Sequence, residues 1–153
     1  MALIDTAMYT LHLLFGGVWA GSVVFLTLGV LPTARDGTAN AEPLRVIVER
    51  LRWVSRTSAL VLFATGGHMA GAGGRYTVES LTGTPRGHLV LGMVALWFLL
   101  AGLVEVGASK LADGFDKKKV RQPARDARPF LLASSVVAVL LLSVGGILAS
   151  GFA

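Results

Sequence analysis

Residues 3–31 read LIDTAMYTLHLLFGGVWAGSVVFLTLGVL, and this stretch decides the fold class. Its only formal charge is Asp5, near its start, and Pro32 follows it directly. A helix rises about 1.5 Å per residue, so a run of this length crosses a hydrocarbon core of about 30 Å. We therefore expect a membrane-spanning helix that ends at Pro32.

This expected span carries a histidine well inside it. His12 lies about 8 residues from the start of the span, hence about 12 Å deep on the rise of a helix. An unpartnered polar group in lipid costs several kcal/mol, so an ionisable side chain at that depth points to a functional site. The rest of the sequence must supply its partner.

The composition of the whole chain is that of a membrane protein. Its 153 residues are 54% hydrophobic and 15% charged, with a mean hydropathy of +0.68. There is no cysteine, which excludes disulfides, thiolate metal ligands and covalent haem attachment. The net charge of +5 does not indicate nucleic-acid binding, because the basic residues cluster between apolar runs. The first apolar run has no basic segment before it and is longer than the apolar core of a signal peptide. We therefore expect it to remain part of the mature protein.

Four apolar runs are long enough to span a membrane, at about 4–31, 54–74, 86–109 and 130–152. The connections 32–53 and 110–129 are rich in Arg and Lys, whereas the connection 75–85 is not. The positive-inside rule then places the two basic connections in the cytoplasm and both termini outside. The predicted fold is all-α: one integral membrane domain, an up-down-up-down four-helix bundle crossing the cell membrane several times.

Prolines shape the expected connections. Pro43 opens the stretch PLRVIVERLRW, which is either an amphipathic helix at the membrane interface or an extension of the second span. Pro123 and Pro129 are expected to break any helix in 110–129, which makes that segment a solvated loop.

The predicted topology puts all three histidines, His12, His68 and His88, in the outer half of the bundle. Small or aromatic residues share a helix face with each of them, namely Gly16 and Trp19 with His12, Ala64 with His68, and Gly92 with His88. The small residues either let the helices pack closely or leave a slot for a flat macrocycle. The pairs Gly17/Gly21 and Gly67/Gly71, at GxxxG spacing, suggest close packing.

Two kinds of site suit these residues. A b-type haem would use His12 and His68 as axial ligands, with His88 as the alternate ligand or a neighbour of the propionates. A copper site would combine imidazole with thioether sulfur, which Met8, one turn before His12, and Met69, beside His68, would supply. We expect haem b, with copper as the alternative.

The inner half of the expected bundle holds an acid inside a span. Glu105 lies about one turn from the inner end of the third span, and Arg52 and Arg56 lie one turn apart at the inner start of the second. A Glu105–Arg56 pair would neutralise the buried charge.

The first span resembles that of the copper-resistance D family of membrane proteins. Its stretch LHLLFGGVWAGSVVF has the opening pattern of that family, here His12, Trp19, Gly21 and Phe25. The likeness continues through RLRWVSRTSALVLFATGG and TPRGHLVLGMVALWFLLAGLVE. The same opening is similar to that of HemJ-type protoporphyrinogen oxidases, four-span proteins that bind haem b through such a histidine. Both resemblances imply that His12 is a ligand.

One departure limits what the resemblance implies. In both families a lysine commonly follows the opening of the third span, whereas this chain has Gly92 there and no lysine before Lys110. This difference weakens the case for assigning either protoporphyrinogen oxidation or copper uptake to this chain.

The expected function is therefore that of a membrane haem protein with a bis-histidine site in the outer leaflet. It would pass electrons between a membrane donor such as a quinol and an external redox partner. The alternatives are a copper-binding or transport protein, and a non-catalytic scaffold subunit of a membrane complex. The sequence does not decide between enzyme and non-enzyme, and it leaves a homo-oligomer open.

Overall fold

The computed structural model describes residues 2–71 and 76–151, and the described chain is helical apart from short connections. The elements in chain order are α1 (Ala2–Phe25), the π-helical turn η1 (Leu26–Val30), α2 (Leu31–Asp36), α3 (Ala41–Gly71), α4 (Val78–Gly83), α5 (Pro85–Asp116) and α6 (Arg121–Ser150). The all-α prediction is confirmed. The ends of the predicted spans at 72–74 and 152, and residue 75 of the second connection, lie outside the described residues.

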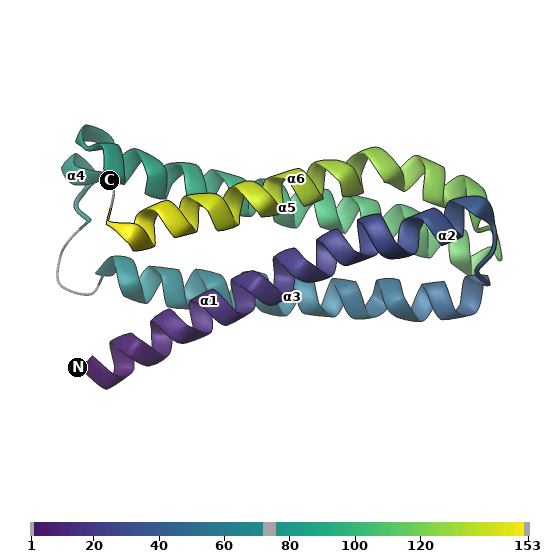
Figure 1. Ribbon diagram of the computed structural model, residues 1–153, viewed down its shortest axis with the longest axis horizontal. Helices are drawn as coiled ribbons and strands as arrows, with labels where there is room; N and C mark the ends of the chain where they lie inside the picture. The colour runs from purple at the N-terminus through teal and green to yellow at the C-terminus, as the bar shows by residue number, and fades with distance from the viewer. Residues whose placement is uncertain (1, 72–75, 152–153) are drawn as a thin grey trace.

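The long helices run back and forth side by side, with α1 crossing the others obliquely (Figure 1). In this arrangement α1 packs on α3 and α6, α3 packs on α5, and α5 packs on α6. Both chain termini and α4 lie at one end, which we call the terminal end. The connections 37–40 and 117–120 lie at the other end, which we call the basic end. The chain therefore has the up-down-up-down arrangement of helices predicted from its sequence.

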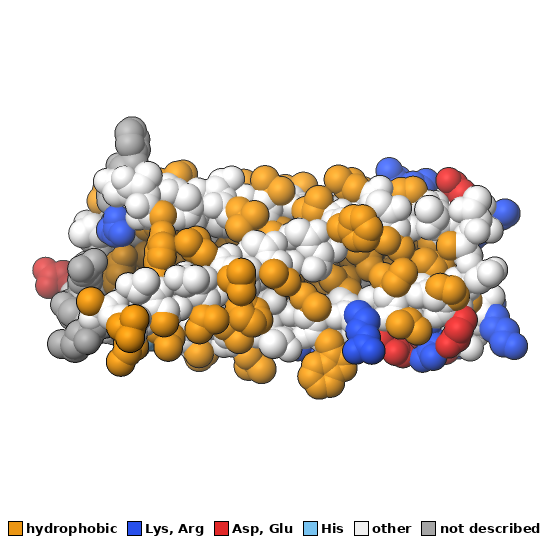
Figure 2. Space-filling view, turned by 60° about the horizontal axis from the view of Figure 1, so that its bottom comes forward, with side chains coloured by type: hydrophobic (Ala, Val, Ile, Leu, Met, Phe, Trp, Pro, Cys, Tyr) orange, Lys and Arg blue, Asp and Glu red, His pale blue; other side chains and the backbone are white. Residues whose placement is uncertain are grey.

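Three segments are long and apolar enough to cross a membrane, namely Ala2–Asp36, Pro85–Asp116 and Arg121–Ser150. These segments are typical of a membrane protein. Helix α3, which contains the second predicted span, is less apolar because Arg52, Arg56 and His68 interrupt it. Apolar side chains cover the middle of the molecule, and charged ones gather at the basic end (Figure 2). This distribution suits a helical bundle surrounded by lipid.

The helix of the first span does not end at Pro32, contrary to our prediction. It continues through η1 and α2 to Asp36, with Pro32 in the first turn of α2. The Leu31 amide donates to the carbonyl of Leu26, the wider spacing of a π-helix. The wider turn accommodates the proline, which has no N–H and whose ring would clash with a carbonyl one regular turn earlier.

The prediction that Pro123 and Pro129 break the helix in 110–129 is also wrong. Helix α5 extends to Asp116 and α6 begins at Arg121, so only residues 117–120 connect them. Pro123 lies in the first turn of α6, where a missing N–H costs little. Pro129 lies inside α6, between the fully buried Ala127 and Leu131. Pro129 itself is exposed, and burial of the flanking helix positions Ala127 and Leu131 in the core offsets the roughly 3 kcal/mol that a proline costs inside a helix.

Of the two interpretations of the stretch that begins at Pro43, the structure has the extended helix. Helix α3 runs without a break from Ala41 to Gly71, so this stretch is the beginning of the helix that contains the second predicted span.

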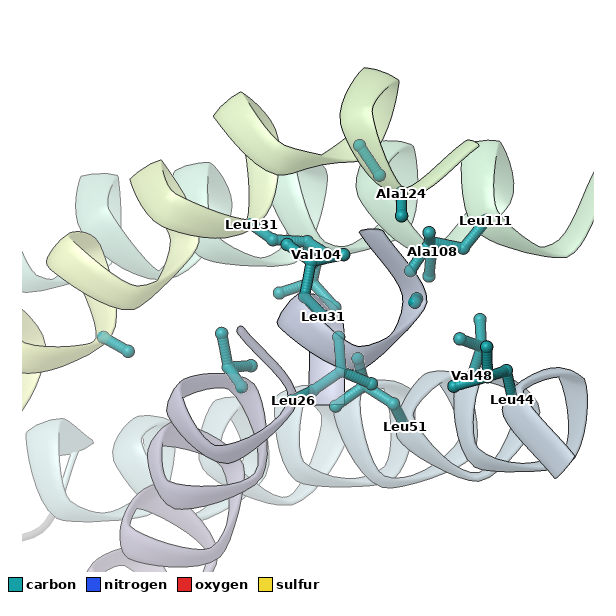
Figure 3. Packing of buried hydrophobic residues seen from close by; sticks show 14 of the residues in the cluster. Leu26, Leu31, Leu44, Val48, Leu51, Val104, Ala108, Leu111, Ala124 and Leu131 are labelled. Atoms are coloured by element: carbon teal, nitrogen blue, oxygen red, sulfur yellow. The ribbon is translucent and has the colours of Figure 1, made fainter. Parts of the chain in front are cut away.

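The hydrophobic core lies in the half of the bundle nearest the basic end. Figure 3 shows its side chains meeting between the helices, among them Leu26, Leu31, Leu44, Val48, Leu51, Val104, Ala108, Leu111, Ala124 and Leu131. By contrast, no described side chain of α1 before Trp19, or of α6 after Ala138, is fully buried. In the most apolar stretch of α5, only 11% of the residues are buried. The bundle is therefore closed around a core at the basic end and open toward the terminal end.

Close helix contacts do not use the glycines that the GxxxG spacing singled out. A Cβ at Gly17, Gly21, Gly67 or Gly71 would meet no atom within 4 Å. The close approach is instead between α5 and α6, where a Cβ at Gly114 would overlap the ring of Pro123 and one at Gly107 would lie 3.0 Å from Leu131. The prediction that the two GxxxG pairs pack helices within this chain is wrong.

Gly114→Ala should lower the free energy of unfolding by about 1–3 kcal/mol, because the new methyl group overlaps Pro123. Gly102→Ala on the same helix is the matched control, since nothing lies within 4 Å of a Cβ there. That control should be neutral or slightly stabilising, because alanine favours the helix. Unfolding of the purified chain in detergent, followed by circular dichroism, measures both. Equal stability of the two variants would contradict this packing.

Candidate functional site

A line of polar contacts joins α1 to α3, and we call it the polar seam. Its members on α1 recur every seven residues, which places them on one face, two turns or about 10.5 Å apart. The seam consists of three pairs: Asp5 with His68, His12 with Thr65, and Trp19 with Ser55. The first pair lies nearest the terminal end and the last nearest the core.

His12 is hydrogen-bonded to Thr65 of the neighbouring helix. Its Nδ1 lies 2.8 Å from Thr65 Oγ1, and that hydroxyl also lies 2.7 Å from the carbonyl oxygen of Val61. A threonine hydroxyl has one proton and gives it to one acceptor at a time. With that proton on the Val61 carbonyl, Thr65 accepts from His12, and a neutral His12 then carries its proton on Nδ1 and its lone pair on Nε2. A metal-binding histidine commonly has this arrangement, with one nitrogen held by a hydrogen bond and the other free for the metal.

Gly66 brings the imidazole of His12 against the backbone of α3. A Cβ at Gly66 would lie 3.2 Å from His12 Cε1, so any larger residue would push the ring away. One turn further into the bundle, a Cβ at Gly16 would lie 3.9 Å from Leu62. Helices α1 and α3 are therefore in contact around His12.

The other predicted flanking residues do not enclose the histidines. Ala64 is exposed, and a Cβ at Gly92 would meet nothing within 4 Å. Trp19 has a structural role in the seam: it is 1% exposed, and its Nε1 donates to Ser55 Oγ at 2.9 Å. Burial of this large ring, with its N–H satisfied, fixes α1 on α3 beside the core.

His68 lies in the same seam as His12 but has a different partner. Its Nε2 is 3.1 Å from Asp5 Oδ1, and the two side chains are 38% and 55% exposed. His68 and Thr65, the partner of His12, both lie on α3, three residues or about one turn apart. The structure therefore brings His12 and His68 to one helix pair, but with separate hydrogen bonds.

Sequence reasoning did not identify Asp5 or Thr65 as partners of the histidines. The signal for Asp5 was present, because it is the only formal charge in the first span and lies seven residues before His12. Thr65 carried no such signal, since many threonines in helices bond only their own backbone.

His88 lies outside the seam. Its Nε2 is 2.7 Å from the carbonyl oxygen of Thr82, and it is exposed beside the junction of α4 and α5. In this arrangement His88 contributes to the connection at the terminal end. The two candidate thioethers, Met8 and Met69, are both half-buried, and Met8 lies one turn before His12.

The predicted Glu105–Arg56 pair is confirmed, and a second arginine joins it. Arg56 Nη2 donates to Glu105 Oε1 at 2.8 Å, and Arg52 donates to the same oxygen. One carboxylate between two guanidinium groups joins α3 to α5 with a net positive charge. Charge-assisted hydrogen bonds of this kind compensate for placing ionic groups beside apolar helices.

Nearer the basic end, Arg45 is occupied by two carboxylates of its own helix. It lies 2.9 Å from Glu42 and 2.6 Å from Glu49. The hydrogen bond from Arg45, together with its charge, holds the pKa of the Glu42 carboxyl below its usual range. These exposed pairs add little stability. They do leave Arg45 less available to an outside anion.

The described residues contain no ready-made cluster for a metal ion. No three or more His, Asp or Glu side chains in 2–71 and 76–151 gather closely enough to hold one.

Comparison of the chain with protein-family models, curated proteins and solved structures finds no match. The resemblance to the copper-resistance D and HemJ-type families stays a prediction.

Proposed function

We propose that this protein binds a transition-metal ion in the membrane through Nε2 of His12, and that the ion is copper. The observation that carries the proposal is the hydrogen-bond chain from His12 to Thr65 to the Val61 carbonyl. It orients the imidazole, and with Thr65 accepting from Nδ1 the Nε2 lone pair would be free for the ion. Second-shell bonds of this kind strengthen a histidine ligand and fix its tautomer.

Copper suits the donors near His12 and the space available there. The thioether of Met8, one turn away on α1, is a soft donor of the kind that selects copper(I). His68 would be a second imidazole if its bond to Asp5 opened, and Met69 is its neighbour. A single ion needs no slot between α1 and α3, which are already in contact at Gly66.

A b-type haem is the second candidate. His12 and His68 would hold it. The support for this pair is weaker than for a single ion, because α1 and α3 are in contact at Gly66 and His68 is hydrogen-bonded to Asp5. What favours haem is the open terminal half, where no described side chain of α1 before Trp19 is fully buried. A macrocycle beside the seam, with His12 as its ligand, would supply electron-transfer chemistry with a quinol or an external partner.

We also propose four spans in the cell membrane, with both termini outside and the basic end in the cytoplasm. Helix α3 packs on α1 and α5, and its two arginines share Glu105, which supports a position across the membrane despite its lower hydropathy. Arg and Lys are concentrated at the basic end, and these residues set orientation. The His12 site would then face the outer leaflet.

Metal content tests the proposed function. We expect about one copper per chain in protein purified in detergent from cells supplied with copper and iron, and no haem spectrum. His12→Ala should abolish copper binding. Thr65→Val should weaken it by about 10- to 100-fold, because the imidazole loses its orienting bond. Thr10→Val is the matched control, since Thr10 is exposed and bonds only the carbonyl of Thr6.

The other outcomes separate the alternatives. A reduced-minus-oxidised haem spectrum that His12→Ala removes would replace copper by haem. Protein with neither metal would reject a metal site and favour a scaffold subunit of a membrane complex. A loss of copper in Thr10→Val as large as in Thr65→Val would contradict the role of Thr65.

Cysteine labelling tests the orientation. An impermeant thiol reagent should label Glu79→Cys, at the terminal end, in intact cells, but should label Lys117→Cys, at the basic end, only after lysis. Both positions are exposed, whereas a cysteine at the fully buried Ala124 would be unreactive on either side. The reverse pattern would place His12 in the inner leaflet, and labelling of both positions in intact cells would refute the four-span topology.

A further inference from the structure

A small cleft lies near the basic end, between the junction of η1 with α2 and the beginning of α6. Its volume is about 160 Å³, and it shares no residue with the polar seam. Leu28, Leu31, Pro32 and Leu132 form its apolar walls, and Arg35 and Arg128 supply its charge. No carboxylate lines it.

The two arginines lack the carboxylate partners that three arginines of α3 have. Arg35 Nε is buried without a hydrogen-bond partner, and neither Arg35 nor Arg128 forms an ion pair within the described residues. By contrast, Arg45, Arg52 and Arg56 are all paired with glutamates. A buried donor on a charged group is costly when unpaired, so this cleft is suited to an anion.

The π-helical turn builds the cleft. It opens the helix ahead of Pro32, and α2 then continues with Arg35 in its last turn. Thr27 attaches this turn to α6, because its hydroxyl lies 3.2 Å from the carbonyl oxygen of Leu131. The same hydroxyl lies 2.8 Å from the carbonyl oxygen of Val23 on its own helix. The cleft is therefore a fixed feature of the α1–α6 contact, and π-helical turns often occur at functional sites.

We propose that this cleft binds the phosphate of an anionic phospholipid, with Arg35 and Arg128 as its ligands. Guanidinium groups bind phosphate oxygens in pairs of charge-assisted hydrogen bonds. Basic clefts at the cytoplasmic ends of membrane helices are known to take anionic headgroups.

Two observations favour a lipid over a free metabolite. The cleft is smaller than the roughly 300–1,000 Å³ of most small-molecule pockets, so it holds a headgroup and little more. Its apolar walls continue outward along the bundle, since Leu28 is 65% exposed and Leu132 is 37% exposed. These side chains would lie against an acyl chain while the phosphate binds the two arginines.

Lipid binding to the full chain tests this proposal. Native mass spectrometry in detergent should show one phosphatidylglycerol retained at concentrations at which phosphatidylcholine with the same acyl chains is lost. Arg35→Gln and Arg128→Gln should each weaken phosphatidylglycerol binding by about tenfold or more, as expected for loss of a charged hydrogen bond. Arg125→Gln is the matched control: it lies one turn earlier on α6, is exposed and does not line the cleft.

Arg128 is exposed, so Arg128→Gln should fold even if the partly buried Arg35 proves necessary for folding. Equal retention of the two lipids, unchanged binding in Arg128→Gln, or an equal loss in Arg125→Gln would overturn the proposal. Inorganic phosphate is the competitor that distinguishes the sources. If equimolar phosphate displaces the lipid, the acyl chain contributes nothing and the ligand is free phosphate instead.

Discussion

Polar side chains inside apolar helices depend on hydrogen-bond partners within the protein, because lipid offers none. This constraint accounts for how α1 and α3 meet. Asp5, His12 and Trp19 lie on one face of α1, and each has a partner on α3. The same constraint joins α3 to α5, where Glu105 bridges two arginines. The contacts that position α1 on α3 thus also orient the imidazole of His12.

The helices of the bundle are held together differently at its two ends. Toward the basic end, the apolar core and the close contact of Gly114 with Pro123 hold the helices together. Toward the terminal end the helices carry few buried side chains, and the polar seam is the main contact between α1 and α3. A region with few buried side chains, next to a well-packed core, can exchange one hydrogen-bond partner for another at a small cost in free energy. That property suits a site where a metal would take His68 from Asp5.

The helices, the gathering of His12 and His68 on one helix pair, and the Glu105–Arg56 bond could be predicted from the sequence, because hydropathy, helical spacing and charge carry that information. The continuation of helices through Pro32 and Pro129 could not, since it depends on a π-helical turn and on tertiary packing. The roles of Thr65 and Gly66 depend on the register between α1 and α3, which no local pattern encodes. The close approach of the His12 imidazole to Gly66 depends on the same register.

The central claim is that Thr65 holds His12 as the Nδ1–H tautomer with Nε2 free for a metal. Nitrogen-15 NMR of the metal-free full chain, labelled at histidine and assigned with His12→Ala, tests it most directly. The account predicts a protonated Nδ1 and an unprotonated Nε2 for neutral His12, and a change at Nε2 when copper(I) is added. An Nε2–H tautomer, with Thr65 donating to Nδ1, would leave His12 no free lone pair and would contradict the account.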